Sequence, residues 1–106
     1  MNAGGQTVDV ENVAAEVGST VRLRCWINST SRVHWDNYRR PNPTVYNGYD
    51  VIGPLRDRYR VDVTDSRYDL VISDVHLTDA GNYTCYDETR RPNVVLLLVV
   101  LRSMCH

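Results

Sequence analysis

The sequence predicts an all-β domain, either a sandwich or a barrel, and three observations lead to that prediction. Apolar residues stand at every second position from Val21 to Ile27, with Arg22 and Arg24 between the first of them, which is typical of a strand with one buried face. Turn signals such as Asn47-Gly48 recur roughly every ten residues. No segment shows a convincing helical period. The length of 106 residues suits one domain of this kind.

Further strands are expected wherever the alternation returns along the chain. Short strands are expected at 44–46 and 49–52, on either side of the Asn47-Gly48 turn. The last strand is expected in the run 94–101, which is apolar throughout. The remaining alternating positions are Val33 and Trp35; Tyr59, Val61 and Val63; Leu70 and Ile72; and Tyr83 and Cys85.

Composition and motifs argue against several function classes. A net charge of −1 gives no reason to expect nucleic acid or an anionic membrane as the partner. The run 94–101 is far shorter than the roughly 20 residues of a membrane-spanning helix, so we expect no membrane contact by this chain itself. The three histidines do not stand at metal-ligand spacing, and no phosphate-binding loop or nucleophile elbow occurs. We therefore expect no enzyme, no metal and no cofactor.

The cysteines point to an oxidising compartment. No pair among Cys25, Cys85 and Cys105 has the C-x-x-C spacing of zinc or redox sites. Two well-separated cysteines and one left over suit a secreted or cell-surface setting better. The opening residues lack the pattern of a signal peptide. We expect a single domain over 1–106, with a flexible start at 1–6 and a tail or stalk at 102–106.

One set of residues resembles a known family. Cys25, Trp35 and the segment Asp-Ala-Gly-Asn-Tyr-Thr-Cys at 79–85 resemble the C…W…D-x-G-x-Y-x-C pattern of the immunoglobulin superfamily. Arg58-Tyr59 and the apolar positions from Leu70 to Val75 also stand where that family has them. The resemblance covers nearly the whole chain. It implies a variable-type sandwich of two antiparallel sheets with about nine strands, because the interval between Trp35 and Cys85 leaves room for strands C′ and C″.

The resemblance also implies what holds the fold together. Cys25 and Cys85 would form one inter-sheet disulfide, which would contribute about 4 kcal/mol by closing a loop of about 60 residues. Trp35 would pack against it, and Tyr83 would form the tyrosine corner. Arg58 and Asp79 would form an ion pair at one end of the sandwich; the alternative is two solvated charges. The expected core residues are Trp35, Tyr83, Leu70 and Ile72.

By resemblance the function is extracellular recognition or adhesion, in a secreted protein or the ectodomain of a membrane receptor. The chain has no Phe, and no Gly follows Gly81, so the Phe/Trp-Gly-x-Gly signature of antigen-receptor domains is absent. This absence counts against a rearranged antibody or T-cell receptor chain.

In such domains strands G, F, C and C′ form a face that commonly binds partners. His34 and Tyr86 should point outward there, because their neighbours Trp35 and Cys85 point inward. The family register places Leu96, Leu98 and Val100 inward and Val95, Leu97 and Val99 outward. We interpret these outward side chains as a homodimer interface between two variable-type domains. The alternative is that loops or the N-terminal segment cover strand G. The full set assigned to this face is His34, Tyr38, Tyr46, Tyr86, Val95, Leu97 and Val99.

Three further features have two interpretations each. Cys105 either forms an interchain disulfide with its twin near the dimer axis or is a stalk cysteine. Arg90 and Arg91 bind an acidic protein or a glycan, or they are solvated surface residues. Asn28 and Asn82 are in N-glycosylation sequons, and Asn82 could instead be a turn residue. The functional alternatives are a monomeric receptor domain that binds through its F–G loop and a structural spacer.

Overall fold

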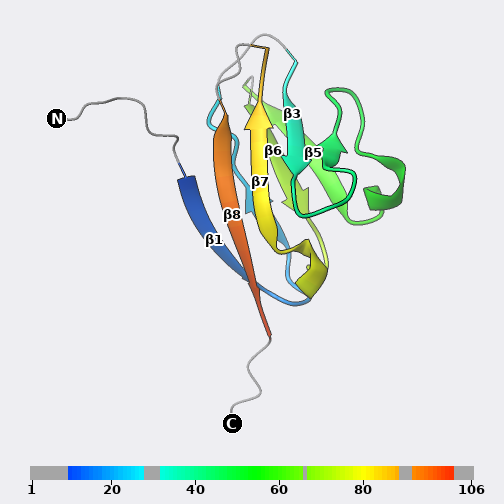
Figure 1. Ribbon diagram of the computed structural model, residues 1–106, viewed down its shortest axis with the longest axis vertical. Coiled ribbons are helices and arrows are strands. Elements are labelled where there is room, and N and C mark those ends of the chain that lie inside the picture. The colour runs from blue at the N-terminus through cyan, green and yellow to red at the C-terminus, as the bar shows by residue number, and fades with distance from the viewer. Residues whose placement is uncertain (1–9, 28–31, 66, 89–91, 102–106) are drawn as a thin grey trace, which may run out of the picture.

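The computed structural model describes residues 10–27, 32–65, 67–88 and 92–101, which form a sandwich of two sheets (Figure 1). The expected all-β fold is confirmed, and the two separate sheets exclude a barrel. Two short 3₁₀ turns interrupt the strands. The elements are β1 (Val10–Glu16), β2 (Val21–Leu23), β3 (His34–Asn37), β4 (Thr44–Tyr46), η1 (Gly53–Leu55), β5 (Tyr59–Thr64), β6 (Arg67–Ile72), η2 (Leu77–Asp79), β7 (Gly81–Tyr86) and β8 (Asn93–Val100).

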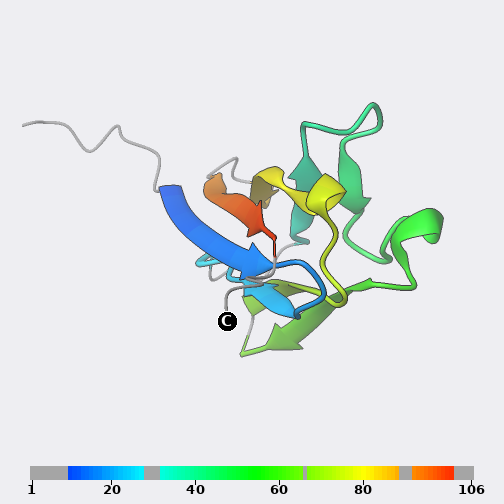
Figure 2. The same ribbon diagram turned by 90° about the horizontal axis from the view of Figure 1, so that it is seen from below.

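The strands divide into a large and a small sheet. The five-stranded sheet has the order β1-β8-β7-β3-β4, and the three-stranded sheet has the order β2-β6-β5. The view from below separates these two layers (Figure 2). Strands β8, β7, β3 and β4 correspond to strands G, F, C and C′ of the expected variable-type sheet.

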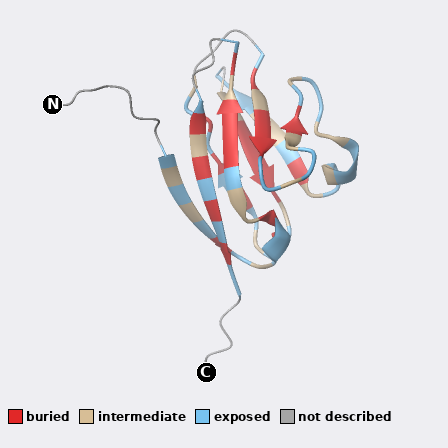
Figure 3. Ribbon diagram, viewed as in Figure 1, coloured by how far each residue is buried: buried red, intermediate tan, exposed pale blue. Residues whose placement is uncertain are grey.

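The core lies between the sheets, where buried residues recur at alternate positions of β8 (Figure 3). The disulfide joins Cys25 to Cys85 across it, as the resemblance implies. Trp35 lies in the same buried cluster, and its indole N–H donates a 2.8 Å hydrogen bond to the carbonyl of Tyr68. The four expected core residues, Trp35, Tyr83, Leu70 and Ile72, have no exposed surface.

A polar network closes one end of the sandwich around Asp79. The Arg58 guanidinium donates to both carboxylate oxygens of Asp79, at 2.6 and 3.0 Å. The Tyr59 hydroxyl and the backbone N–H of His76 donate to the same carboxylate. The Tyr83 hydroxyl donates to the backbone carbonyl of Asp79, which is the tyrosine-corner contact. The Asp79 side chain is only 4% exposed, so the alternative of two solvated charges does not apply.

The first strand was not predicted from the sequence. Strand β1 runs parallel to β8 from the Val10–Val94 pair to the Glu16–Val100 pair. Two antiparallel sheets were expected, and this parallel pair is a correction to that expectation. Alternation in β1 is weak because apolar Val10 and Ala14 stand at exposed positions, whereas the charged Glu11 stands at a partly buried one.

The expected C″ strand at 49–52 is also absent from the described residues. Only an isolated bridge between Tyr46 and Val51 remains there. The Asn47 side chain accepts hydrogen bonds from the backbone N–H groups of Tyr49 and Asp50, so the chain turns instead of extending. The described part therefore has eight strands instead of about nine.

The register expected for the last strand is wrong. Strand β8 pairs Val95 with Tyr83 and Asn93 with Cys85, and residues directly opposite each other project from the same face. Val95, Leu97 and Val99 are consequently buried in the core, whereas Leu96, Leu98 and Val100 face outward. A shift of one residue exchanges the two faces of a strand, and a run that is apolar at every position does not reveal the shift.

The described residues contain neither a candidate membrane-spanning helix nor a candidate metal site. No helix there has the length and apolar character needed to cross a membrane. No group of three or more His, Cys, Asp or Glu side chains there is arranged to hold a metal ion.

Candidate recognition surface

The outer face of the five-stranded sheet, which points away from β2, β6 and β5, carries two depressions. The β3–β7 register places His34 opposite Tyr86 and Asp36 opposite Thr84 on this face. The β7–β8 register adds Asn82 opposite Leu96. Alternation along three strands therefore brings together side chains that are far apart in the sequence.

The first depression, here named the aromatic hollow, has a volume of about 610 Å³. The rings of His34 and Tyr86 stack in it with their centroids 5.2 Å apart and their planes within 9°. Tyr38 projects at its edge and is 60% exposed. Its lining residues are His34, Tyr38, Thr84, Tyr86, Asp87, Glu88 and Pro92.

Carboxylates give the aromatic hollow an acidic character. The Tyr38 hydroxyl donates a 3.2 Å hydrogen bond to the carboxylate of Asp36, which is nearly buried beneath it. Partial burial and then the charge of Asp36 raise the pKa of the Tyr38 hydroxyl, so the phenol stays neutral. Asp87 and Glu88 add two further carboxyl groups to the lining.

The second depression, here named the apolar groove, lies where β7, β8 and β1 run side by side. Its volume is about 580 Å³. Leu98 is 61% exposed within it, and Leu96 is also exposed. The lining residues are Asn12, Val13, Ala14, Gly81, Asn82, Leu96, Leu97 and Leu98.

The structure divides the residues that were predicted to bind a partner. It brings His34, Tyr38 and Tyr86 together in the aromatic hollow. Tyr46 does not belong to this surface: it pairs with Trp35, lies in the buried core cluster and is therefore a correction. Val95, Leu97 and Val99 are excluded as contact residues by the register of β8. Arg90, Arg91, Cys105 and Asn28 lie outside the described residues.

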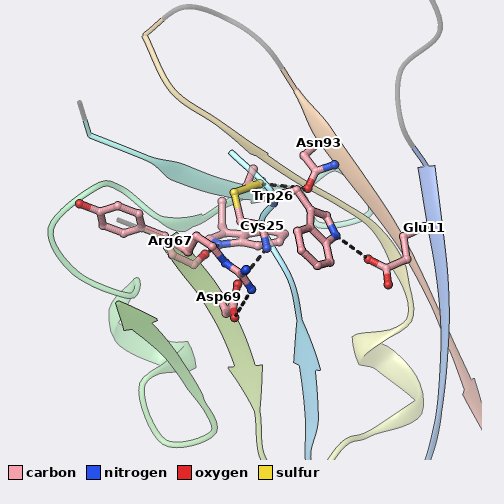
Figure 4. Close-up of a disulfide and its surroundings, with 9 residues drawn as sticks. Glu11, Cys25, Trp26, Arg67, Asp69 and Asn93 are labelled. Atoms are coloured by element: carbon pink, nitrogen blue, oxygen red, sulfur yellow. Dashed lines mark hydrogen bonds and ion pairs between the residues drawn. A yellow bond between two sulfur atoms is a disulfide. The ribbon is translucent and has the colours of Figure 1, made fainter. Parts of the chain in front are cut away.

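Sequence reasoning missed a group of residues beside the disulfide (Figure 4). The half-exposed ring of Trp26 lies under the guanidinium of Arg67, 4.7 Å from the ring centroid, and its indole N–H donates to Glu11 on β1. The Trp26 backbone N–H donates to Asn93 on β8. Trp26 thus links β1 and β8 to the disulfide. The sequence feature that could have pointed to Trp26 is its position directly after Cys25.

The immunoglobulin domain family matches residues 6–86, which is most of the chain. The chain belongs to this family. Immunoglobulin domains are typically recognition domains without catalytic activity.

Solved structures of immunoglobulin domains share the fold. The first immunoglobulin domain of the mouse polymeric immunoglobulin receptor is 19% identical, with a TM-score of 0.72, over 90% of this chain and 94% of that one. The first domain of Dpr11, solved bound to DIP-gamma, is 26% identical, with a TM-score of 0.69, over 85% and 98%. The first domain of RIG-5, solved as a homodimer, is 21% identical, with a TM-score of 0.72, over 90% and 94%.

Proposed function

We propose that this immunoglobulin domain is an extracellular recognition module that pairs with a second copy of itself through the aromatic hollow. The observation that carries the proposal is the clustering of exposed and half-exposed aromatic rings around a depression on the outer face. Tyrosine and other aromatic residues are enriched at protein interfaces because a rigid ring supplies a large contact area.

The surface has features that a two-fold contact needs. An isologous interface must be self-complementary, so a protruding group on one copy has to meet a depression on the other. Tyr38 protrudes at the edge, and the His34–Tyr86 stack lies within the hollow. A two-fold axis near the hollow would place Tyr38 of each copy against the stack of the other.

The structural neighbours support pairing between domains of this fold. The first domains of RIG-5 and of ZIG-8 were solved as homodimers, and that of Dpr11 was solved bound to DIP-gamma. The buried cysteines and the family are consistent with an extracellular setting.

The test is the molar mass of the chain measured by light scattering over a range of concentrations, compared with Tyr38→Ala. We expect the wild type to approach twice the monomer mass of 12.1 kDa and Tyr38→Ala to weaken association about tenfold, because an aromatic anchor is lost. Val63→Ala is the matched control, since Val63 is exposed on β5 of the opposite sheet.

A wild type that stays monomeric at every concentration would contradict self-association. If Tyr38→Ala and Val63→Ala weaken self-association equally, the aromatic hollow is not the contact surface. Repeating the measurement with Cys105→Ser separates pairing by the face from pairing by an interchain disulfide, which stays a prediction.

A further inference from the structure

The apolar groove exposes aliphatic side chains on the outer face. Its floor is formed by Leu96 and Leu98, and the side chain of Leu98 is among the most exposed aliphatic groups of the described chain. Large contiguous apolar patches on soluble proteins often mark sites where another group binds. The edge of β8 is already paired with β1, but β1 covers only the edge and leaves the outward side chains bare.

Amide side chains flank the floor of the groove. In the registers of the two neighbouring strands, Leu96 stands directly opposite Asn12 on β1 and opposite Asn82 on β7. All three side chains are exposed on the outer face. The resulting row is amide, apolar, amide across three strands. Such a row offers hydrogen bonds at its sides and an apolar contact in its middle, which matches the hydroxyls and the C–H face of a sugar ring.

One of these amides lies in a glycosylation sequon. Asn82, Tyr83 and Thr84 form an Asn-x-Thr sequon, and the Tyr83 side chain between them points into the core. Asn82 and Thr84 consequently share the outer face, and the Thr84 hydroxyl donates a 3.3 Å hydrogen bond to Oδ1 of Asn82. A sugar attached to Nδ2 of Asn82 would begin its course beside Leu96.

We infer that Asn82 carries an N-linked glycan whose first sugars lie in the apolar groove over Leu96 and Leu98. In the transfer step, Nδ2 of Asn82 forms a bond to C1 of an N-acetylglucosamine carried on a lipid diphosphate. The bond between C1 and the diphosphate oxygen breaks, and Nδ2 loses one proton. The inference rests on the extracellular part of the proposed function, because this reaction takes place in the secretory pathway.

The glycan would divide the outer face into two parts. It covers the side formed by β1 and β8, so a protein partner cannot approach Leu98 closely. The aromatic hollow lies on the side of β3 and toward residues 87–92, and it stays accessible. The glycan therefore makes the groove unavailable and directs pairing to the hollow.

The first measurement is glycan occupancy. The full chain is secreted from eukaryotic cells with Asn28→Gln, so that Asn82 holds the remaining sequon that is open to modification. We expect the peptide containing Asn82 to carry an N-glycan by mass spectrometry and to lose it on treatment with a peptide N-glycosidase. An unmodified Asn82 in the secreted protein would overturn the inference.

The second measurement tests whether the glycan covers the groove. Fluorescence of the apolar dye anilinonaphthalene sulfonate is expected to be low with the glycoprotein and to rise several-fold after Asn82→Gln. Adding Leu98→Ser to Asn82→Gln should return the signal to the low value, because the exposed leucine is gone. If Asn82→Gln is not secreted, the enzyme removes the glycan from the folded protein instead.

Equal dye fluorescence with and without the glycan would overturn the covering role even if Asn82 is modified. These readouts are independent of pairing through the hollow. The molar mass of Tyr38→Ala reports on the proposed function, whereas occupancy and dye binding report on Asn82. Failure of one is therefore distinguishable from failure of the other.

Discussion

At the scale of single residues, Asp79 is the centre of the polar network at one end of the sandwich. Burial of its carboxylate opposes ionisation, but hydrogen bonds from Arg58, Tyr59 and the backbone of His76 outweigh that effect. Together they lower the pKa of Asp79 below its ordinary value of 3.8. Burial also raises the pKa of the Tyr83 hydroxyl to about 12, so this donor keeps its proton at neutral pH.

Replacing Arg58 by alanine should destabilise the domain by roughly 3 kcal/mol. The cause is that the carboxylate of Asp79 would stay buried without its guanidinium partner. Urea unfolding followed by tryptophan fluorescence measures the change. Arg56→Ala is the matched control, since the Arg56 side chain is exposed and bonds only to the carbonyl of Val51 among the described contacts. If Arg58→Ala lowers the unfolding free energy no more than Arg56→Ala does, the Arg58–Asp79 pair is not stabilising.

The same network predicts a pH dependence. The folded state binds fewer protons at Asp79 than the unfolded state, so this group adds stability above about pH 4 and loses it as the pH falls through the lowered pKa. The difference in unfolding free energy between wild type and Asp79→Asn should therefore be largest above pH 4 and shrink in acid. Unfolding titrations at a series of pH values measure it. A difference that stays constant down to acid pH would contradict the lowered pKa.

Single residues were predictable where the family motif marks them. Cys25, Trp35, Tyr83 and Cys85 hold the roles that the resemblance implies, because the core of a sandwich constrains side chains of this size and chemistry. Tyr46 was assigned to the wrong face. Register changes between Trp35 and Asp36 along the β3–β4 pair, and such an irregularity leaves no trace in an alternating pattern.

At the scale of the element, strand β8 shows what a hydropathy pattern cannot predict, namely which side chains of an apolar strand face the core. Its apolar residues at every position predicted a strand correctly but gave no information on which half faces the core. Only the pairing of Asn93 with Cys85 and of Val95 with Tyr83 decides this. Likewise, strand β1 forms because it pairs with β8, and the C″ strand is missing because the chain turns at Asn47. Local propensity decides neither outcome.

The corrected register of β8 leads to a direct comparison of adjacent residues. Leu97→Asp should destabilise the domain by about 4 kcal/mol or prevent folding, because Leu97 is 3% exposed and the charge would be buried without a partner. Leu98→Asp should change stability by no more than about 0.5 kcal/mol, since Leu98 faces solvent. Thermal unfolding of the two variants measures the contrast. The reverse order would restore the register expected from the sequence.

At the scale of the whole molecule, one face of the five-stranded sheet carries both depressions, and we propose that the aromatic hollow meets a protein partner and the apolar groove a glycan. The opposite sheet instead presents charged side chains, where Arg22 pairs with Asp62 and Asp69. Ion pairs of this kind keep a sheet solvated and discourage contact with another protein. The two sides of the sandwich therefore differ in chemistry, which supports our proposal that recognition uses the side of β3, β7 and β8.

The central claim is that two copies meet at the aromatic hollow, and an NMR dilution series of the backbone amide resonances tests it most directly. We predict concentration-dependent shifts at His34, Tyr38, Thr84 and Tyr86, with constant resonances along β2, β5 and β6. Shifts confined to the three-stranded sheet, or no shifts at any concentration, would contradict pairing through this face.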